Sequence, residues 1–235
     1  MNLPLNSLLD RNDPTENARY NMVQQQVRPW NVDGERLLDA LYTVRREDFT
    51  PPAHYSLAFM DVLVPLTEGA QSLDKGECMF QPRVEARMIN DVDVKPTDHV
   101  LEIGTGSGYS AALLSKLAKE VVTLELNAEL AEMARENLAD AGCDNVSVRV
   151  ADGSKDVLPE GPFDVIMLSG SVESIPEELL PHLKDGGRLS AIVGNEPVMR
   201  FTMVTKQGGS IVTKTPWDIV APRLHGFNTT NRFKF

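Results

Sequence analysis

The stretch His99-Val-Leu-Glu-Ile-Gly-Thr-Gly-Ser-Gly-Tyr109 decides the fold of this chain, because an apolar run leads directly into three closely spaced glycines. A helical pattern follows over 110–117, so the stretch predicts a strand, a tight loop and a helix. In an α/β sheet such a loop lies beyond the carboxyl end of its strand, where glycines let the backbone turn tightly and approach a ligand. We therefore expect a cofactor over residues 104–108.

Helical and strand patterns alternate on both sides of this loop. Helices are predicted over 84–92, 110–117, 128–141 and 176–183, and strands over 99–103, 121–126, 146–150, 164–168 and 188–193. Strands separated by helices imply βαβ units and a parallel sheet. Two further strands, 201–205 and 210–213, flank Gly208-Gly209 and predict an antiparallel hairpin at the sheet edge. The fold class is therefore α/β, with a doubly wound, mostly parallel seven-stranded sheet.

The first 82 residues predict a helical segment followed by a long loop. Thr15 to Val27 has the pattern of one helix, which Pro29 ends. Asp33 is a candidate N-cap for a second helix through Thr43. Residues 61–82 have no sustained period, and a long loop in a compact domain usually covers a site. We expect three parts: an N-terminal helical segment with this loop (1–82), a cofactor-binding core (83–226) and a C-terminal tail (227–235).

The composition limits the classes of protein to which the chain can belong. With 23 Lys and Arg against 34 Asp and Glu, the net charge is −11, which disfavours binding to nucleic acid. The two cysteines are too few for a disulfide framework, and the N-terminal stretch lacks the pattern of a signal peptide. No apolar run approaches ~18 residues, so no membrane span is predicted. We therefore expect a cytoplasmic protein, and the spacing of its histidines predicts no metal site.

Two acidic residues at strand ends accompany the glycine loop. Glu125 ends the second strand 21 residues after Gly104 (125 − 104), near the ~20-residue offset at which an acid binds ribose hydroxyls. Asp152 ends the third strand, where a carboxylate can accept a hydrogen bond from an exocyclic amine. Tyr109 stands where a dinucleotide fingerprint has its last glycine. A nucleoside site therefore fits better than a pyrophosphate site, and a nicotinamide dehydrogenase is disfavoured.

Three segments resemble the class I methyltransferases: Leu101-Glu-Ile-Gly-Thr-Gly-Ser-Gly108, Asp164-Val-Ile-Met-Leu-Ser169 and Leu183-Lys-Asp-Gly-Gly-Arg-Leu189. The resemblance implies a Rossmann-like fold and S-adenosyl-L-methionine as the cofactor. Glu102, as a strand-end acid, is expected to face the positively charged sulfonium. The expected cofactor-binding residues are Glu102, Gly104, Thr105, Gly106, Ser107, Gly108, Glu125, Leu126, Asp152, Gly153 and Gln81.

The chain more closely resembles the protein-L-isoaspartate O-methyltransferases. The matching residues are Val44-Arg-Arg-Glu-Asp-Phe49 with Pro51, Ala58-Phe-Met-Asp61, Pro65-Leu66, Gln81-Pro82, Ile103-Gly-Thr-Gly-Ser-Gly-Tyr109, Asp144-Asn145-Val146 and Asp152-Gly153. The resemblance implies repair of damaged protein, in which the extra-chain carboxylate of an isoaspartyl residue is methylated and the ester cyclises to a succinimide. Such a carboxylate, with a reference pKa of about 4, is ionised at neutral pH and needs no general base.

The loop before Pro82 departs from the family's pattern, a Gly-Gln-Thr-Ile-Ser-x-Pro-like sequence whose hydroxyls face the active site. Aligned back from Pro82, the Thr-Ile-Ser positions hold Cys78, Met79 and Phe80. Aligned forward from Glu68-Gly69, the stretch Gln71-Ser72-Leu73 matches the start of the loop instead. The candidate catalytic positions are therefore Ser72, Cys78 and Phe80. Phe80 also suits a core anchor, and Cys78 a small buried side chain.

Three functions stay open at this point. The first is an isoaspartyl-type O-methyltransferase that acts on a protein or peptide. The second is a methyltransferase with a small-molecule acceptor, which a deep closed pocket would favour. The third is a cofactor-binding protein that has lost transfer through its altered loop. Because the expected cofactor residues are intact, the loop predicts altered positioning of the acceptor more than lost cofactor binding.

Overall fold

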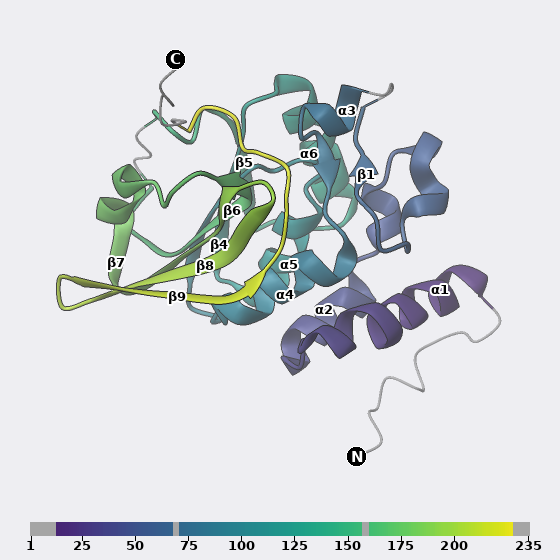
Figure 1. The fold of residues 1–235 in the computed structure, drawn as a ribbon. Helices are drawn as coiled ribbons and strands as arrows, with labels where there is room; N and C mark the ends of the chain where they lie inside the picture. The colour runs from purple at the N-terminus through teal and green to yellow at the C-terminus, as the bar shows by residue number, and fades with distance from the viewer. Residues whose placement is uncertain (1–12, 68–70, 157–159, 228–235) are drawn as a thin grey trace.

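A seven-stranded sheet runs through the computed structural model, which describes residues 13–67, 71–156 and 160–227 (Figure 1). Its strands lie in the order β5-β4-β3-β6-β7-β8-β9. Their bounds are His99–Ile103 for β3, Glu120–Glu125 for β4, Val146–Val150 for β5, Phe163–Val172 for β6, Leu183–Asn195 for β7, Val198–Gln207 for β8 and Ser210–Asp218 for β9. The strands from β3 to β7 pair in parallel, and β8 pairs antiparallel with both of its neighbours. The predicted α/β class and mostly parallel seven-stranded sheet are confirmed.

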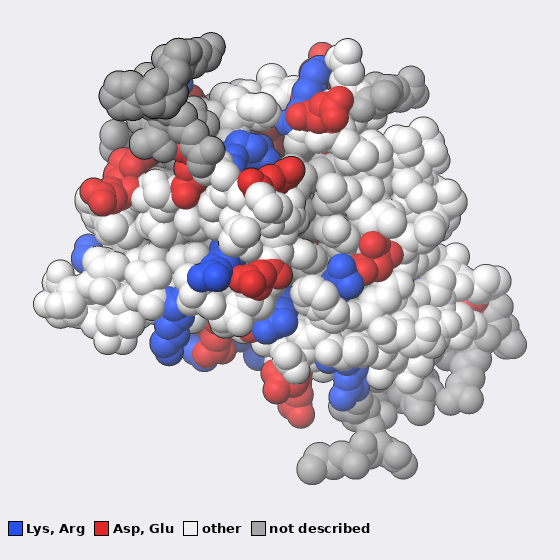
Figure 2. Space-filling model, in the orientation of Figure 1, with Lys and Arg blue, Asp and Glu red and all other residues white. Residues whose placement is uncertain are grey.

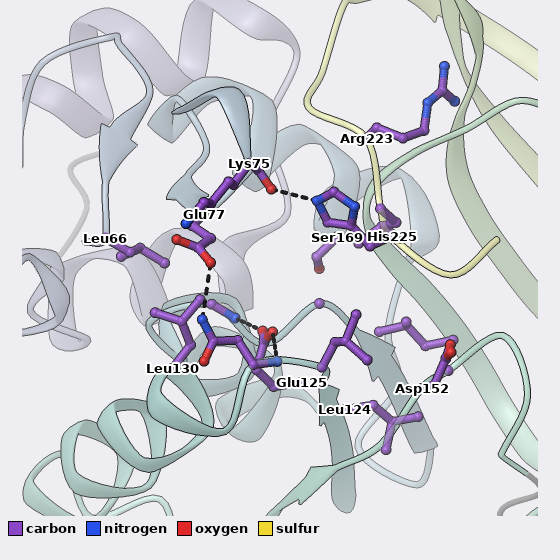
Figure 3. Close-up of a pocket in the computed structure, with 18 of the residues that line it drawn as sticks. Leu66, Lys75, Glu77, Leu124, Glu125, Leu130, Asp152, Ser169, Arg223 and His225 are labelled. Atoms are coloured by element: carbon purple, nitrogen blue, oxygen red, sulfur yellow. Dashed lines mark hydrogen bonds between the residues drawn. The ribbon is translucent and has the colours of Figure 1, made fainter. Parts of the chain in front are cut away.

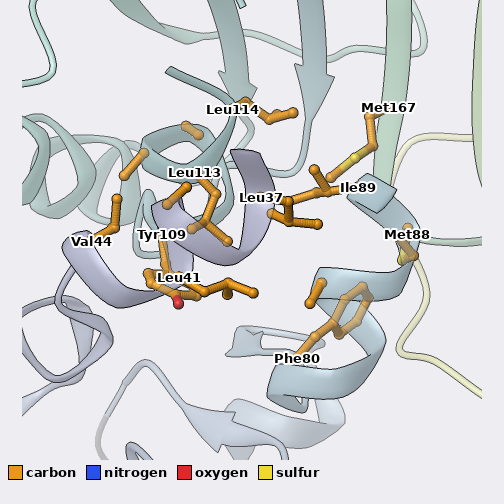
Figure 4. Close-up of a cluster of buried hydrophobic side chains, with 14 of the residues drawn as sticks. Leu37, Leu41, Val44, Phe80, Met88, Ile89, Tyr109, Leu113, Leu114 and Met167 are labelled. Carbon is orange, nitrogen blue, oxygen red and sulfur yellow. The ribbon is translucent and has the colours of Figure 1, made fainter. Parts of the chain in front are cut away.

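The two faces of the sheet belong to separate apolar clusters. Consecutive residues of a strand point to opposite faces, so Val100 packs in one cluster and Leu101 in the other. Helices cover the first face: α2 (Glu35–Thr43), α4 (Pro82–Val92), α5 (Tyr109–Leu117) and α6 (Ala128–Asp140). Figure 4 shows Leu41 of α2, Ile89 of α4 and Leu113 of α5 in this cluster. Burial on both faces explains why the central strands are apolar along most of their length.

The second face is covered by a shorter element than the sequence predicts. The helix expected over 176–183 is a 3₁₀ helix, η6 (Glu177–His182). Pro181 lies inside it and has no amide hydrogen to donate, so an α-helix cannot continue through this position. Leu179 nevertheless reaches the second apolar cluster. The expected layer is therefore present in 3₁₀ rather than α geometry.

The N-terminal segment is helical, as predicted, but the N-cap of its second helix is not the predicted residue. It contains α1 (Pro14–Met22), a π-helical turn η2 (Val23–Val27) and a 3₁₀ turn η3 (Arg28–Trp30). The N–H of Thr15 donates to Oδ1 of Asp13 over 2.8 Å and so caps α1. The prediction that Asp33 caps the second helix is wrong, because Gly34 is the N-cap of α2. The N–H of Gly34 donates to Oδ1 of Asn90 over 3.1 Å, so a contact with α4 takes the place of a local cap.

The predicted loop over 61–82 contains short regular elements. Strands β1 (Val64–Pro65) and β2 (Cys78–Met79) pair antiparallel, and α3 (Gln71–Asp74) lies between them. The 3₁₀ turns η4 (Arg46–Phe49) and η5 (Pro52–Leu57) precede this region. Glu68 and Gly69, from which one alignment of the loop starts, lie outside the described residues. The described part of the loop is thus held as a small two-stranded unit.

A buried arginine attaches this loop to the core. Nη1 of Arg46 donates to Oε2 of Glu85 over 2.8 Å, and Nε donates to the carbonyl of Ala58 over 2.9 Å. The remaining Nη2 donates to the carbonyl of Phe80, and the guanidinium lies 4.8 Å from the centre of the Tyr109 ring. Burial raises the pKa of Glu85, while the Arg46 charge lowers it. The backbone at residue 80 is therefore fixed by a fully buried side chain.

The C-terminal part of the sheet agrees with the sequence prediction. Strands β8 and β9 form the expected hairpin, with Gln207 opposite Ser210 across the two glycines. Of the predicted tail over 227–235, the described residues include Phe227, which packs on the second apolar cluster. Within the described ranges, no helix is both long enough and apolar enough to cross a membrane.

Candidate active site

A cavity of about 190 Å³ lies at the carboxyl ends of four neighbouring strands (Figure 3). Its wall includes Ile103 from β3, Leu124 from β4 and Ser169 from β6, together with Ala151 directly after β5. The chain passes outward from β3 through β4 to β5 and then returns to β6 on the other side of β3. Ligands of α/β sheets bind at such a change in strand order.

Gly104 and Gly106 of the glycine loop line this cavity. Gly104 and Gly106 have φ angles of 97° and 54°, which favour glycine. The N–H of Gly104 donates to the carbonyl of Leu124 over 2.9 Å. A Cβ on Gly104 would lie 2.9 Å from the side chain of Leu224. The loop therefore needs glycine for both its conformation and its close contact with the C-terminal segment.

Glu125 presents its carboxylate to the cavity. Oε2 accepts from the N–H of Gly106 over 2.9 Å, and Oε1 accepts from the N–H of Asn127 over 3.0 Å. A carboxylate has about four acceptor positions, so both oxygens keep capacity for hydroxyl donors of a ligand. Leu126, also predicted here, lines the same wall with 52% of its surface exposed.

Asp152 lines another part of the same cavity (Figure 3). Gly153 lines it as well. Oδ1 of Asp152 accepts from the hydroxyl of Ser154 over 2.6 Å, and Oδ2 accepts from Nζ of Lys155 over 2.6 Å. Hydrogen bonds from Lys155 and Ser154 lower the pKa of Asp152, so it is an ionised acceptor. A Cβ on Gly153 would lie 2.6 Å from Ile103. Glycine at this position therefore keeps the strand ends close together.

Five other predicted cofactor residues are not among the described residues that line this cavity. Neither Glu102 nor Gln81 is among the described residues that line the cavity, and Glu102 is fully buried. The structure thus places Glu102 outside the described lining of the cavity, and its expected contact with the cofactor stays a prediction. Thr105, Ser107 and Gly108 are also buried or at a helix start rather than in the cavity wall.

The three candidate catalytic positions have different surroundings. Ser72 is buried and its hydroxyl donates to the carbonyl of Glu77 over 2.6 Å while it accepts from the amides of Leu66 and Thr67. Its hydroxyl is thus occupied in holding the loop. Phe80 lies in the apolar core (Figure 4) with 8% of its surface exposed. Cys78 lines the cavity, but burial raises the pKa of its thiol to about 12, so the thiol stays neutral.

Several lining residues were not predicted, and two segments supply six of them. The first is the loop at 75–77, whose Glu77 accepts from Nδ2 of Asn127 over 3.0 Å. The second is the C-terminal segment, where Nε2 of His225 lies 2.8 Å from the carbonyl of Lys75 (Figure 3). Ser169 was also missed, although its place at the carboxyl end of a strand was a usable signal. Among the described residues, no group of three or more His, Cys, Asp or Glu could hold a metal ion.

Comparison with known proteins identifies the family. The family model described as "Protein-L-isoaspartate(D-aspartate) O-methyltransferase (PCMT)" matches residues 17–220. The chain belongs to this family. The protein-L-isoaspartate O-methyltransferase of Koribacter versatilis is 37% identical over 193 residues, which is 82% of this chain and 84% of the relative. The one from Methanoculleus marisnigri is 37% identical over 201 residues, which is 86% of this chain and 88% of the relative.

The fold of the family is also found among solved structures. A protein-L-isoaspartate O-methyltransferase from Plasmodium falciparum, solved in complex with S-adenosyl-L-homocysteine, is similar with a TM-score of 0.74 at 19% identity. The match covers 90% of this chain and 98% of that chain. At 19% identity, this structural similarity is evidence for the fold alone. Together, the comparisons confirm the predicted protein-L-isoaspartate O-methyltransferase family, its enzyme class and its Rossmann-like sheet.

Proposed function

We propose that this chain transfers a methyl group from S-adenosyl-L-methionine to the free carboxylate of isoaspartyl residues in damaged proteins. Membership of the family supports the reaction type. The observation that carries the proposal is the presence of Glu125 and Asp152, two strand-end carboxylates, on one cavity beside the glycine loop. That arrangement offers acceptors for the two hydrogen-bonding parts of a nucleoside.

The cavity suits this cofactor chemically. S-adenosyl-L-methionine supplies a methyl group on a positively charged sulfur when it is bound. Glu125 would accept from ribose hydroxyls, and Asp152 from an exocyclic amine. Gly104 and Gly106 have no side chain, so a ligand can approach the backbone closely at these positions. The Plasmodium falciparum relative was solved with S-adenosyl-L-homocysteine, which is consistent with this assignment.

The chain's task toward the acceptor is to hold and enclose it. A carboxylate with a reference pKa of about 4 is ionised at neutral pH, so no side chain has to remove a proton. Alignment of the reacting atoms and exclusion of water can together lower a barrier by ~7–11 kcal/mol. The contact between His225 and Lys75 joins the loop and the C-terminal segment over the cavity. We infer that this junction performs the enclosure.

A second cavity of about 590 Å³ adjoins the first and provides space for the acceptor. The two share Gly76, Arg223 and His225, and apolar side chains such as Leu63 and Val220 line the second. A site that extends over two adjoining cavities suits a polypeptide better than a small molecule, for which a deep closed pocket is expected. We assign the loop within 1–82 to the acceptor and the core over 83–226 to the cofactor.

The charges of the chain fit a protein substrate better than nucleic acid. The net charge is −11, and on the face shown in Figure 2 the basic and acidic side chains are interspersed. We therefore infer a partner that is a damaged protein or peptide.

Cys78 and Cys143 are both free thiols in the structure. We therefore infer a reducing, cytoplasmic location.

The decisive experiment is transfer of labelled methyl from S-adenosyl-L-methionine to an isoaspartyl peptide and to its normal aspartyl twin. Base-labile ester on the isoaspartyl peptide alone is the expected result. Ester on neither peptide, with cofactor binding measured in the same sample, would reject the proposed acceptor. The Glu125→Gln variant serves as a control that should lose transfer through weaker cofactor binding.

A further inference from the structure

The altered loop raises the question of which hydroxyl takes the place of the family's loop hydroxyl. The positions aligned back from Pro82 hold Cys78, Met79 and Phe80, none of which carries one. Among the described residues that line the cofactor cavity, Ser169 is the one hydroxyl side chain. Ser169 also lines a narrow space of about 30 Å³ together with Cys78 and Phe80. Its hydroxyl therefore lies where the cofactor cavity meets the altered loop.

We propose that Ser169 orients the acceptor carboxylate in this chain, and that the buried Glu102 positions the Ser169 hydroxyl. The inference rests on the proposed function, because it assumes a carboxylate acceptor. Ser169 is half-buried in the last part of β6, next to the glycine loop. A Cβ on Gly104 would lie 3.3 Å from the Ser169 carbonyl, which shows how close the two segments come. A ligand bound over the glycine loop would therefore contact Ser169.

A chain of hydrogen bonds fixes the Ser169 hydroxyl from below. Its Oγ lies 2.8 Å from Oε1 of Glu102. Oε2 of Glu102 accepts from the hydroxyl of Thr123 over 2.7 Å. The hydroxyl oxygens of Thr123 and Thr105 lie 2.7 Å apart and share a hydrogen bond. Glu102 and Thr123 are fully buried and Thr105 is nearly so. Because none of these partners can easily move, the rotamer of Ser169 is set before an acceptor arrives.

The protonation state of Glu102 decides which way the Ser169 hydroxyl donates. An ionised Glu102 can only accept, so it holds the hydroxyl hydrogen and leaves lone pairs toward an acceptor carboxylate. A protonated Glu102 donates from Oε1 to Ser169, whose own hydrogen is then free to bind an acceptor oxygen. The protonated form is therefore the one that favours a carboxylate.

The surroundings of Glu102 keep its protonated form available near neutral pH. Burial raises the pKa of Glu102 to about 7, although the hydroxyls of Ser110, Thr123 and Ser169 lower it. Glu85 on α4, paired with Arg46, is the nearby charged group and raises it further. We therefore expect kcat/KM for the peptide to fall as the pH rises through about 7.

The test compares variants of Ser169 in the full chain with an isoaspartyl peptide as acceptor. Ser169→Ala should lower kcat/KM for the peptide by ~10–100-fold, the range for a hydrogen bond to a charged group. The dissociation constant of S-adenosyl-L-homocysteine should stay within about threefold of the parent value. The proposed cofactor contacts of Glu125, Asp152 and the glycine loop are unchanged in this variant. Ser169→Thr keeps a hydroxyl and should retain most of the activity. Ser190→Ala, which removes another buried hydroxyl on the adjacent strand β7, is the matched control.

Glu102→Gln provides a readout that a merely structural role would not change. A Gln amide does not titrate, and with its oxygen accepting from Thr123 its NH2 group donates to Ser169. The variant should therefore keep its activity above pH 7 and lose the fall seen in the parent protein. A parent protein that forms no ester on the isoaspartyl peptide would reject the proposed function and this inference together. An active parent with an unimpaired Ser169→Ala variant would reject this inference alone. The inference would also be overturned if Ser169→Ala lost activity because it binds the cofactor more weakly. The same holds if Glu102→Gln kept the pH profile of the parent protein.

Discussion

The N–H of Gly106 donates to Oε2 of Glu125 over 2.9 Å, so the glycine loop and the acid at the end of β4 form one unit. The other carboxylate oxygen accepts from the N–H of Asn127, which is the N-cap residue of α6. Two backbone donors therefore orient the Glu125 carboxylate without help from a ligand. The proposed site for ribose hydroxyls is thus preorganised by the loop that also bounds the cavity.

Glu125→Gln tests the proposed ribose contact. The substitution keeps the volume but replaces one acceptor oxygen with a donor, which opposes the N–H of Gly106 or Asn127. We expect the dissociation constant of S-adenosyl-L-homocysteine, measured by calorimetry, to rise by ~10–100-fold. Glu136→Gln, on an exposed position of α6, is the control and should bind normally. Unchanged affinity in Glu125→Gln would place the ribose elsewhere.

Gly106→Ala tests the need for a bare backbone in the loop. The residue has a φ of 54°, and its Cβ would lie 3.2 Å from Leu66. Gly142→Ala is a matched control, because Gly142 has a φ of 63° and nothing within 4 Å of an added Cβ. Both variants should lose about 1 kcal/mol of unfolding free energy to backbone strain. We expect Gly106→Ala alone to lose cofactor affinity, and equal affinities would argue against a ligand over this loop.

The regular part of the fold was predictable because its signals are local. Strands over 99–103 and 146–150 have the predicted bounds, and each is a short apolar or alternating run with clear ends. The helix expected over 176–183 was wrong in type because Pro181 removes a donor inside it. The Asp33 cap was wrong because a side chain from α4 satisfies that helix end, a contact far away in the sequence.

The candidate site was predictable only where it coincides with strand ends. Glu125 ends β4 and Asp152 follows β5, so their place at the cavity could be inferred. Glu102 could not be placed in this way, because it lies inside β3, one residue before the end of the strand, and its side chain is fully buried. The C-terminal segment could not be found this way, because it pairs with the sheet at an isolated bridge between Ser171 and Arg223 and has no period of its own.

Cys78→Ala tests whether the cavity thiol takes part in transfer. Burial and the nearby Glu85 raise the pKa of the thiol to about 12, so the nucleophilic thiolate is scarce at pH 7 to 9. We expect kcat/KM for an isoaspartyl peptide to change by less than about threefold. Cys143→Ala removes the other free thiol and is the control for general effects on folding. A loss of two orders of magnitude specific to Cys78→Ala would show that the thiol contributes to transfer.

Glu102→Gln should also change how stability depends on pH. Burial raises the pKa of Glu102 from 4.5 to about 7 in the folded state, so the folded chain holds this proton more tightly than the unfolded chain. The stability from this group is therefore complete below about pH 4.5 and is lost as the pH rises through about 7.

The loss amounts to up to about 3 kcal/mol, because a tenfold difference in proton affinity between the folded and unfolded chains corresponds to about 1.4 kcal/mol. Gln does not titrate, so the variant should match the parent near pH 4.5 and exceed its unfolding free energy by up to that amount above pH 7. Urea denaturation at several pH values measures the difference, with Glu136→Gln as an exposed control. A difference between variant and parent that is constant with pH would show that Glu102 does not titrate in this range, and would remove the basis for a proton on Glu102 at neutral pH.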